Sequence, residues 1–152
     1  MTDGTASAAI AGETDPGKLR NRIAKAERME RQEVALAARR RPIEVAARAQ
    51  VDGADDPLML DFWKIILALE AALTDERQRA VRLRRTRQTR ARAGVEKTVI
   101  DLILDAKPTS GYAMLAQRSM LDLSAEAVAS RHPARFSASV LDAARRRLDA
   151  SA

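Results

Sequence analysis

The sequence predicts an all-α protein, and three observations carry that prediction. Apolar residues recur at helical spacing, as in "VEKTVIDLIL" at 95–104. No alternating, β-branched run marks a half-buried strand. Asp15-Pro16 and Asp56-Pro57 repeat one helix-start signal, in which the aspartate accepts first-turn N–H groups and the proline, which has no N–H, occupies the first helical position.

The first helix is expected to begin at Pro16. Because Pro42 cannot donate the i to i−4 hydrogen bond, it should end or kink this helix after Arg40 or Arg41. "PIEVAARAQ" is then a short helix, and "VDGADD", with Gly53, is a turn. The first helix has an apolar stripe made of Leu19, Ile23, Ala26, Val34 and Ala37.

A second, long helix is expected from Pro57 to Gly94, where the glycine suits the position after the helix end. Its apolar positions fall at alternating spacings of four and three, interrupted by Glu76, and form a heptad seam. The seam consists of Phe62, Ile66, Leu69, Leu73, Ala80 and Leu83. Such a short seam is compatible with an antiparallel hairpin against the first helix or with a homodimer.

After Gly94 the pattern predicts a compact bundle with helices at about 95–106, 111–120, 124–132 and 138–150. Ser124 and Ser137 are candidate N-caps, and His132-Pro133 is a stop signal. The expected organisation is a disordered tail at 1–14, a helical hairpin or coiled coil at 15–93 that ends in an arginine-rich helix, and a helical bundle at 95–152.

Positive charge is concentrated in one segment. The net charge is +6, and residues 77–97 hold nine basic residues and one acidic residue, whereas the rest of the chain holds 18 basic and 20 acidic residues. This distribution is typical of a polyanion site. The arginines are Arg77, Arg79, Arg82, Arg84, Arg85, Arg87, Arg90 and Arg92.

On one continuous helix these arginines would surround the axis, so the segment should be poorly stable unless phosphates or carboxylates neutralise it. We expect contacts with the phosphates of DNA or RNA. The alternatives are a solvated segment without a ligand, an acidic protein partner and a membrane surface, of which the last is disfavoured because no apolar anchors adjoin the charges.

Residues 115–132 predict two short helices joined by a turn, which loosely resembles a helix-turn-helix. The turn is about two residues longer than in that motif and lacks its glycine, so ordinary helix pairing is the favoured interpretation.

The sequence offers little for catalysis. It has no cysteine, one histidine (His132), no spaced carboxylate cluster and no phosphate-binding loop, so we expect no enzymatic activity, metal or cofactor. Tyr112 and His132 are interpreted as structural residues. No secretory signal pattern appears, and the apolar run 57–73 is too short and too charged to cross a bilayer.

We therefore predict a cytoplasmic, non-enzymatic nucleic-acid-binding accessory protein, with a homodimer and a protein partner of residues 95–152 as further expectations and no membrane association. The alternative is a helical protein–protein adaptor or scaffold without a nucleic-acid ligand.

Overall fold

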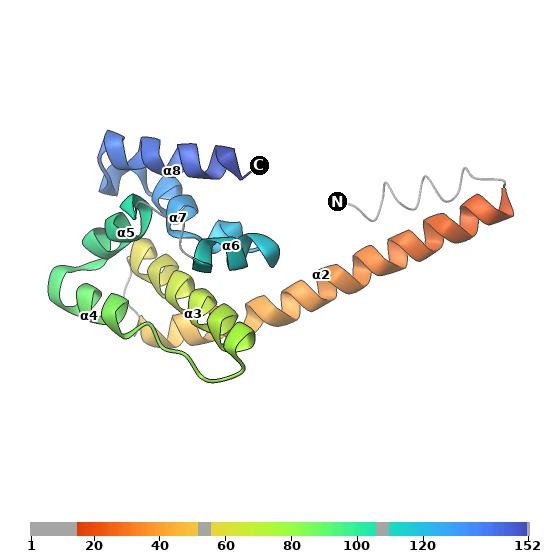
Figure 1. The fold of residues 1–152 in the computed structure, drawn as a ribbon, viewed down its shortest axis with the longest axis horizontal. Coiled ribbons are helices and arrows are strands. Elements are labelled where there is room, and N and C mark those ends of the chain that lie inside the picture. Colours follow the sequence, from red (N-terminus) through yellow and green to blue (C-terminus); the bar gives the residue numbers. More distant parts are fainter. Residues whose placement is uncertain (1–14, 52–55, 106–109, 152) are drawn as a thin grey trace. The chain divides into compact units, whose positions relative to one another are not determined.

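The structure, a computed structural model, describes residues 15–51, 56–105 and 110–151. Within these ranges it consists of seven α-helices and two short 3-10 helices and has no strand, which confirms the all-α prediction (Figure 1). The predicted tail at 1–14 and the turn at Gly53 lie outside the described residues.

The α-helices and 3-10 helices (η) follow one another along the chain as α2 (Pro16–Gln50), α3 (Pro57–Arg77), α4 (Arg84–Ala93), α5 (Val95–Leu104), α6 (Ser110–Gln117), η1 (Leu121–Leu123), α7 (Ala125–Arg131), η2 (Pro133–Arg135) and α8 (Ala138–Ala150). By its contacts the chain divides into two compact units, one up to Arg41 and one from Pro42 onward. The contacts therefore do not separate residues 57–93 from residues 95–152.

The predicted helix starts are confirmed. The Asp15 carboxylate accepts the N–H groups of Gly17 at 2.8 Å and Lys18 at 3.2 Å, and the Asp56 carboxylate accepts that of Leu58 at 3.0 Å. Ser124 and Ser137 likewise cap α7 and α8, accepting the N–H groups three residues ahead. His132 is the C-cap of α7, as the stop signal predicted.

Pro42 was predicted to end or kink the first helix, and the first of these outcomes is wrong: the helix does not end at Arg40 or Arg41, and residues 42–50 are not a separate short helix. Although Pro42 lacks an N–H, α2 continues through it to Gln50. The residues after the proline belong to the second unit, where Ile43 and Ala47 are buried. Tertiary packing thus holds the last two turns helical, against the cost of a proline inside a helix.

The core of the second unit is built around α3. Phe62, Ile66, Leu69 and Leu73 of the predicted seam are all buried there. Helix α3 packs against α5, α6, α7 and η1, so this seam is covered by the C-terminal helices of the same chain (Figure 1). A homodimer through these four residues would therefore require the unit to open.

The prediction of one helix from Pro57 to Gly94 is also wrong, because α3 ends at Arg77. Gln78 takes a left-handed conformation with φ of 54°, and the chain stays non-helical until α4 begins at Arg84. Ala80 is exposed in this connector, whereas Leu83 is half-buried and packs with Val81 against Ala72, Leu73 and Met114. The last two seam positions thus do not extend the α3 stripe.

Helix α7 lies inside the unit and packs against α3, α5 and α8. Four of its seven residues are buried, namely Ala125, Glu126, Val128 and Ala129. A recognition helix must present a free face to a DNA groove, so this arrangement argues against the helix-turn-helix alternative.

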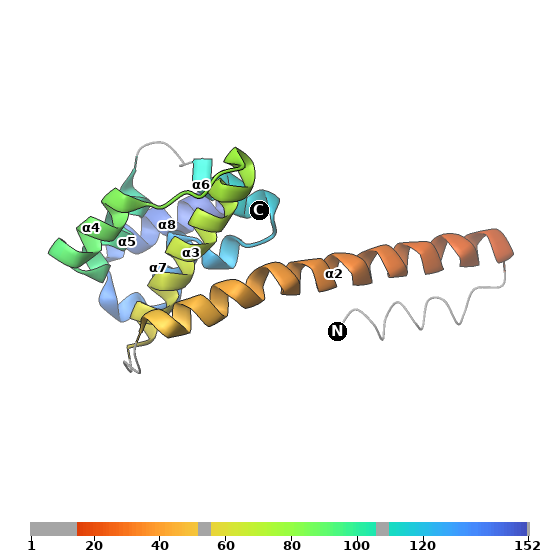
Figure 2. The same cartoon turned by 90° about the horizontal axis from the view of Figure 1, so that it is seen from below.

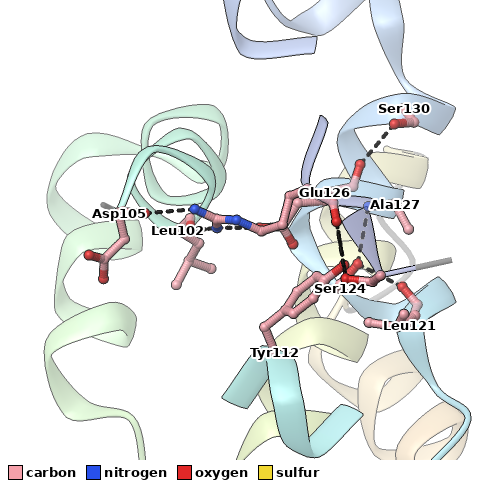
Figure 3. A network of polar contacts seen from close by, with 10 residues as sticks. Leu102, Asp105, Tyr112, Leu121, Ser124, Glu126, Ala127 and Ser130 are labelled. Atoms are coloured by element: carbon pink, nitrogen blue, oxygen red, sulfur yellow. Dashed lines mark hydrogen bonds and ion pairs between the residues drawn. The ribbon is translucent and has the colours of Figure 1, made fainter. Parts of the chain in front are cut away.

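A polar network joins α7 to α5 and α8 (Figure 3). The buried Glu126 carboxylate accepts from Arg147 Nη1 at 2.8 Å, and Arg147 Nη2 donates to the carbonyl of Asp105 at 2.7 Å. The Tyr112 hydroxyl lies 2.8 Å from Ser151 Oγ. Arg147 therefore points into the unit, and Tyr112 has a structural role there.

Candidate nucleic-acid interface

The connector between α3 and α4, residues 78–83, folds back along α3. After the reversal at Gln78, the Val81 N–H donates to Thr74 Oγ1 at 3.0 Å, and the Leu83 N–H donates to Glu70 Oε2 at 2.8 Å. These bonds pair residues that are progressively farther apart in sequence, as in a hairpin. The start of α4 is thereby fixed next to the middle of α3.

Glu70 then binds α4 itself. Arg87 donates from Nε to Oε2 at 2.8 Å and from Nη2 to Oε1 at 2.6 Å, so the guanidinium and the carboxylate meet fork to fork. Glu70 is 7% exposed. The hydrogen bond to Glu70 raises the pKa of Arg87, which stays protonated. A buried carboxylate is thus neutralised by an arginine 17 residues away.

Trp63 forms the second half of this contact. The guanidinium carbons of Arg87 and Arg90 lie 5.3 and 5.1 Å from the centre of its ring, within the range of a cation–π interaction. Phe62 packs edge-on against the same tryptophan, with ring centres 5.6 Å apart. We call Trp63, Glu70, Arg87 and Arg90 the α4 anchor.

The anchor divides the arginines of α4 between two sides of the helix. With Arg84 at 0°, Arg87 and Arg90 lie at roughly 300° and 240°, toward α3, whereas Arg85 and Arg92 lie at roughly 100° and 80°. The side that faces away from α3 therefore presents Arg84, Arg85 and Arg92, all exposed.

Three further exposed arginines precede α4: Arg77 at the end of α3, and Arg79 and Arg82 in the connector. We call the six exposed residues the outward arginines; they are Arg77, Arg79, Arg82, Arg84, Arg85 and Arg92. None of them forms an ion pair with another residue in the described part of the chain. No acidic residue occurs between Arg77 and Gly94.

The sequence prediction that the arginines encircle one helix is therefore wrong. The eight predicted residues occupy the last position of α3, the connector and α4, and two of them bind α3. Tertiary contacts decide this outcome, because Glu70 and Trp63 supply the carboxylate and the aromatic face that a free basic helix would lack. One signal of this pairing was available in the sequence. Glu70 is the only acidic residue within the apolar run 65–73, and a carboxylate buried at such a position needs a positively charged partner.

Residues 16–41 form a second basic segment, which the total charge of the residues outside 77–97 does not reveal. Residues 16–41 hold nine basic and three acidic residues, and residues 42–76 hold two basic and eight acidic residues. The near-neutral total outside residues 77–97 conceals this difference. Residues 16–41 thus carry a net charge of +6, from nine basic and three acidic residues.

The remaining polar groups offer no comparable arrangement. His132 Nε2 lies 2.8 Å from Asp61 Oδ2, which ties the end of α7 to α3. A cavity of about 20 Å³ between α3, α6 and α7 has room for about one water molecule. No cluster of three or more metal-ligating side chains occurs among the residues that the structure describes.

No protein-family model, curated protein or solved structure matches this chain. Among the described helices, none has the length and apolar character needed to cross a membrane.

Proposed function

We propose that this protein is a non-enzymatic accessory protein that binds nucleic acid through phosphate contacts of the outward arginines. The observation that carries the proposal is the sorting of the arginines: Arg87 is paired with Glu70, Arg90 lies over the ring of Trp63, and six are exposed without an acidic partner among the described residues. Guanidinium groups of this kind suit phosphate oxygens, which accept their paired N–H donors.

The anchor supports this function energetically. A basic helix that orders only on binding loses conformational entropy at that step, which weakens the complex. Because Glu70, Trp63 and the connector hydrogen bonds fix α4 in the free protein, its outward arginines are positioned before a ligand arrives. Preorganisation also distinguishes this surface from a solvated basic segment.

Gel-shift titrations with double-stranded DNA, single-stranded DNA and RNA at several salt concentrations test the proposal. If the six outward arginines meet phosphates, log K should fall with log salt with a slope of about −5 on duplex DNA, since roughly 0.9 counterions are released per contact. Absence of binding to all three nucleic acids, with binding to an acidic protein instead, would favour the adaptor.

A matched pair of variants separates these contacts from overall charge. Arg84→Gln with Arg85→Gln should lower the magnitude of the slope by about 2 and weaken binding to all sequences. Arg145→Gln with Arg146→Gln removes the same charge from two adjacent exposed arginines of α8 and should leave the slope unchanged. Equal effects of the two double variants would contradict the proposed site.

A further inference from the structure

Helix α4 presents one uncharged polar side chain among its outward arginines. With Arg84 at 0° on a helix of 100° per residue, Gln88 lies at roughly 40°, whereas Arg92 and Arg85 lie at roughly 80° and 100°. Gln88 follows Arg84 by four residues and precedes Arg92 by four, so these side chains are neighbours on the helix surface. The outward side of α4 is therefore a row in which arginines flank a central glutamine.

The side chain of Gln88 is available to a ligand. It is exposed and forms no hydrogen bond with another residue in the described part of the chain. The opposite side of α4 is held against α3 by the α4 anchor, and the helix also packs against α5. Figure 2 shows α4 at the edge of the second unit, as Figure 1 does from another direction. Tertiary contacts thus fix the helix with this row facing outward.

The burial of the aromatic residues argues against a single-stranded ligand. Proteins that bind single strands commonly stack the bases on exposed aromatic side chains. All four aromatic residues of this chain, Phe62, Trp63, Tyr112 and Phe136, are buried, each with at most 9% exposure. The outward arginines therefore have no aromatic platform beside them, and a duplex, whose bases already stack on one another, is the better partner.

The dimensions of α4 fit duplex DNA. An α-helix with its side chains is about 10–12 Å across, and the major groove of B-form DNA is about 12 Å wide. The arginines on either side of Gln88 would then lie next to the phosphates that border the groove, and the glutamine would lie next to the base edges. The major groove of A-form RNA is deep and too narrow for side chains to reach the bases. The geometry thus favours DNA over duplex RNA.

We propose that the outward side of α4 enters the major groove of duplex DNA and that Gln88 contacts a base pair there. This inference rests on the proposed function and deepens it, because it adds a base-contacting residue to the phosphate-binding surface. The glutamine amide suits adenine: its oxygen accepts from the N6 amino group and its nitrogen donates to N7. Arg84, Arg85 and Arg92 contact the phosphates and fix the helix in register.

Selection from a library of duplex DNA with a random central sequence tests this assignment on the full chain. The wild type should enrich sequences that share an adenine at one position. Gln88→Ala should reduce the discrimination at that position by at least about fivefold, the lower limit for a bidentate base contact. It should keep the salt slope, because no charge is removed. Alanine favours helix, and circular dichroism verifies that the fold is retained.

The matched control is Gln117→Ala, at an exposed glutamine at the end of α6, which should keep the wild-type preference. Equal effects of Gln88→Ala and Gln117→Ala on the selected sequences would overturn the inference.

A modified base checks the contact itself. In 7-deazaadenine a C–H group replaces N7, so the acceptor is lost while base pairing and the phosphates are kept. In the selected duplex this replacement should weaken binding of the wild type severalfold and leave binding of the Gln88→Ala variant unchanged. Equal weakening for both proteins would show that Gln88 does not bind N7 and would overturn the inference.

Failure of this inference is distinguishable from failure of the proposed function. If the wild type binds duplex DNA without sequence preference, or if Gln88→Ala selects the same adenine, only the inference is overturned. Stronger binding to single-stranded DNA or to RNA than to duplex DNA likewise overturns only the inference. If the wild type binds no nucleic acid, both are overturned.

Discussion

At position 70 a carboxylate is buried in an otherwise apolar helix face, and its position explains much of the candidate interface. Three hydrogen bonds reach its two oxygens, one from the Leu83 N–H and two from the Arg87 guanidinium. An ion pair of this kind need not stabilise a protein more than apolar residues would, but loss of one partner leaves the other uncompensated. Glu70 therefore specifies where α4 lies.

Replacement Glu70→Gln should lower the free energy of unfolding by about 2–3 kcal/mol, because it leaves the half-buried Arg87 without its counter-charge. Urea denaturation measures this loss. Glu76→Gln, at a carboxylate whose side chain is 62% exposed, is the control and should stay within about 0.5 kcal/mol of the wild type. A Glu70 variant as stable as this control would show that the anchor does not hold α4.

At the scale of elements, one arginine joins the starts of two helices. Arg135 in η2 binds Asp56, the N-cap of α3, at 3.0 Å and also binds Glu96 in the first turn of α5. The bond to Arg135 lowers the pKa of Asp56 below its ordinary value of 3.8. For Glu96 the bond to its own backbone N–H and then that to Arg135 lower the pKa below 4.5.

These shifts set the sign of a pH dependence. Because both pKa values are lower in the folded protein, the unfolded chain binds more protons below about pH 5, and the stabilisation is lost as the pH falls through the lowered values. Arg135→Gln should therefore flatten the decline of the urea midpoint between pH 5 and pH 3. Arg146→Gln, an exposed arginine of α8, should retain the wild-type decline. A variant at Arg135 with an unchanged pH profile would contradict this assignment.

At the scale of the whole molecule, the two units differ in how they are stabilised. The second unit has a core around α3, whereas residues 16–41 bury no side chain. Good helix formers such as alanine, arginine and glutamate are frequent in this part of α2, but a helix without tertiary contacts is only marginally stable in water. Residues 16–41 should therefore open more easily than the helices of the second unit.

Hydrogen exchange tests this difference. The amides of residues 16–41 should exchange with far less protection than those of α3, since local opening of an isolated helix costs much less than unfolding of the core. If the amides of residues 16–41 and those of α3 were equally protected in the free protein, a second copy of the chain would instead be expected to cover residues 16–41.

The sequence by itself determined the features that depend on neighbouring residues: the all-α class, the capped starts at Asp15, Asp56, Ser124 and Ser137, and the stop at His132. These signals are local, because a cap or a proline acts within one turn of a helix. The buried positions Phe62, Ile66, Leu69 and Leu73 also follow from periodicity. The elements that cover these positions do not follow from periodicity, because an apolar stripe indicates that a helix face is buried but does not identify the element that packs against it.

Only the tertiary structure decided that the arginine segment is split. Ala80 and Leu83 continue the helical pattern in sequence. In the structure, however, the N–H groups of Val81 and Leu83 bind Thr74 and Glu70, and the side chains of Val81 and Leu83 pack against Ala72, Leu73 and Met114. Likewise, the continuation of α2 through Pro42 depends on the burial of Ile43 and Ala47. In each case contacts between residues distant in sequence outweighed a local preference. Burial of apolar side chains is favourable, and an unpaired buried carboxylate would be costly.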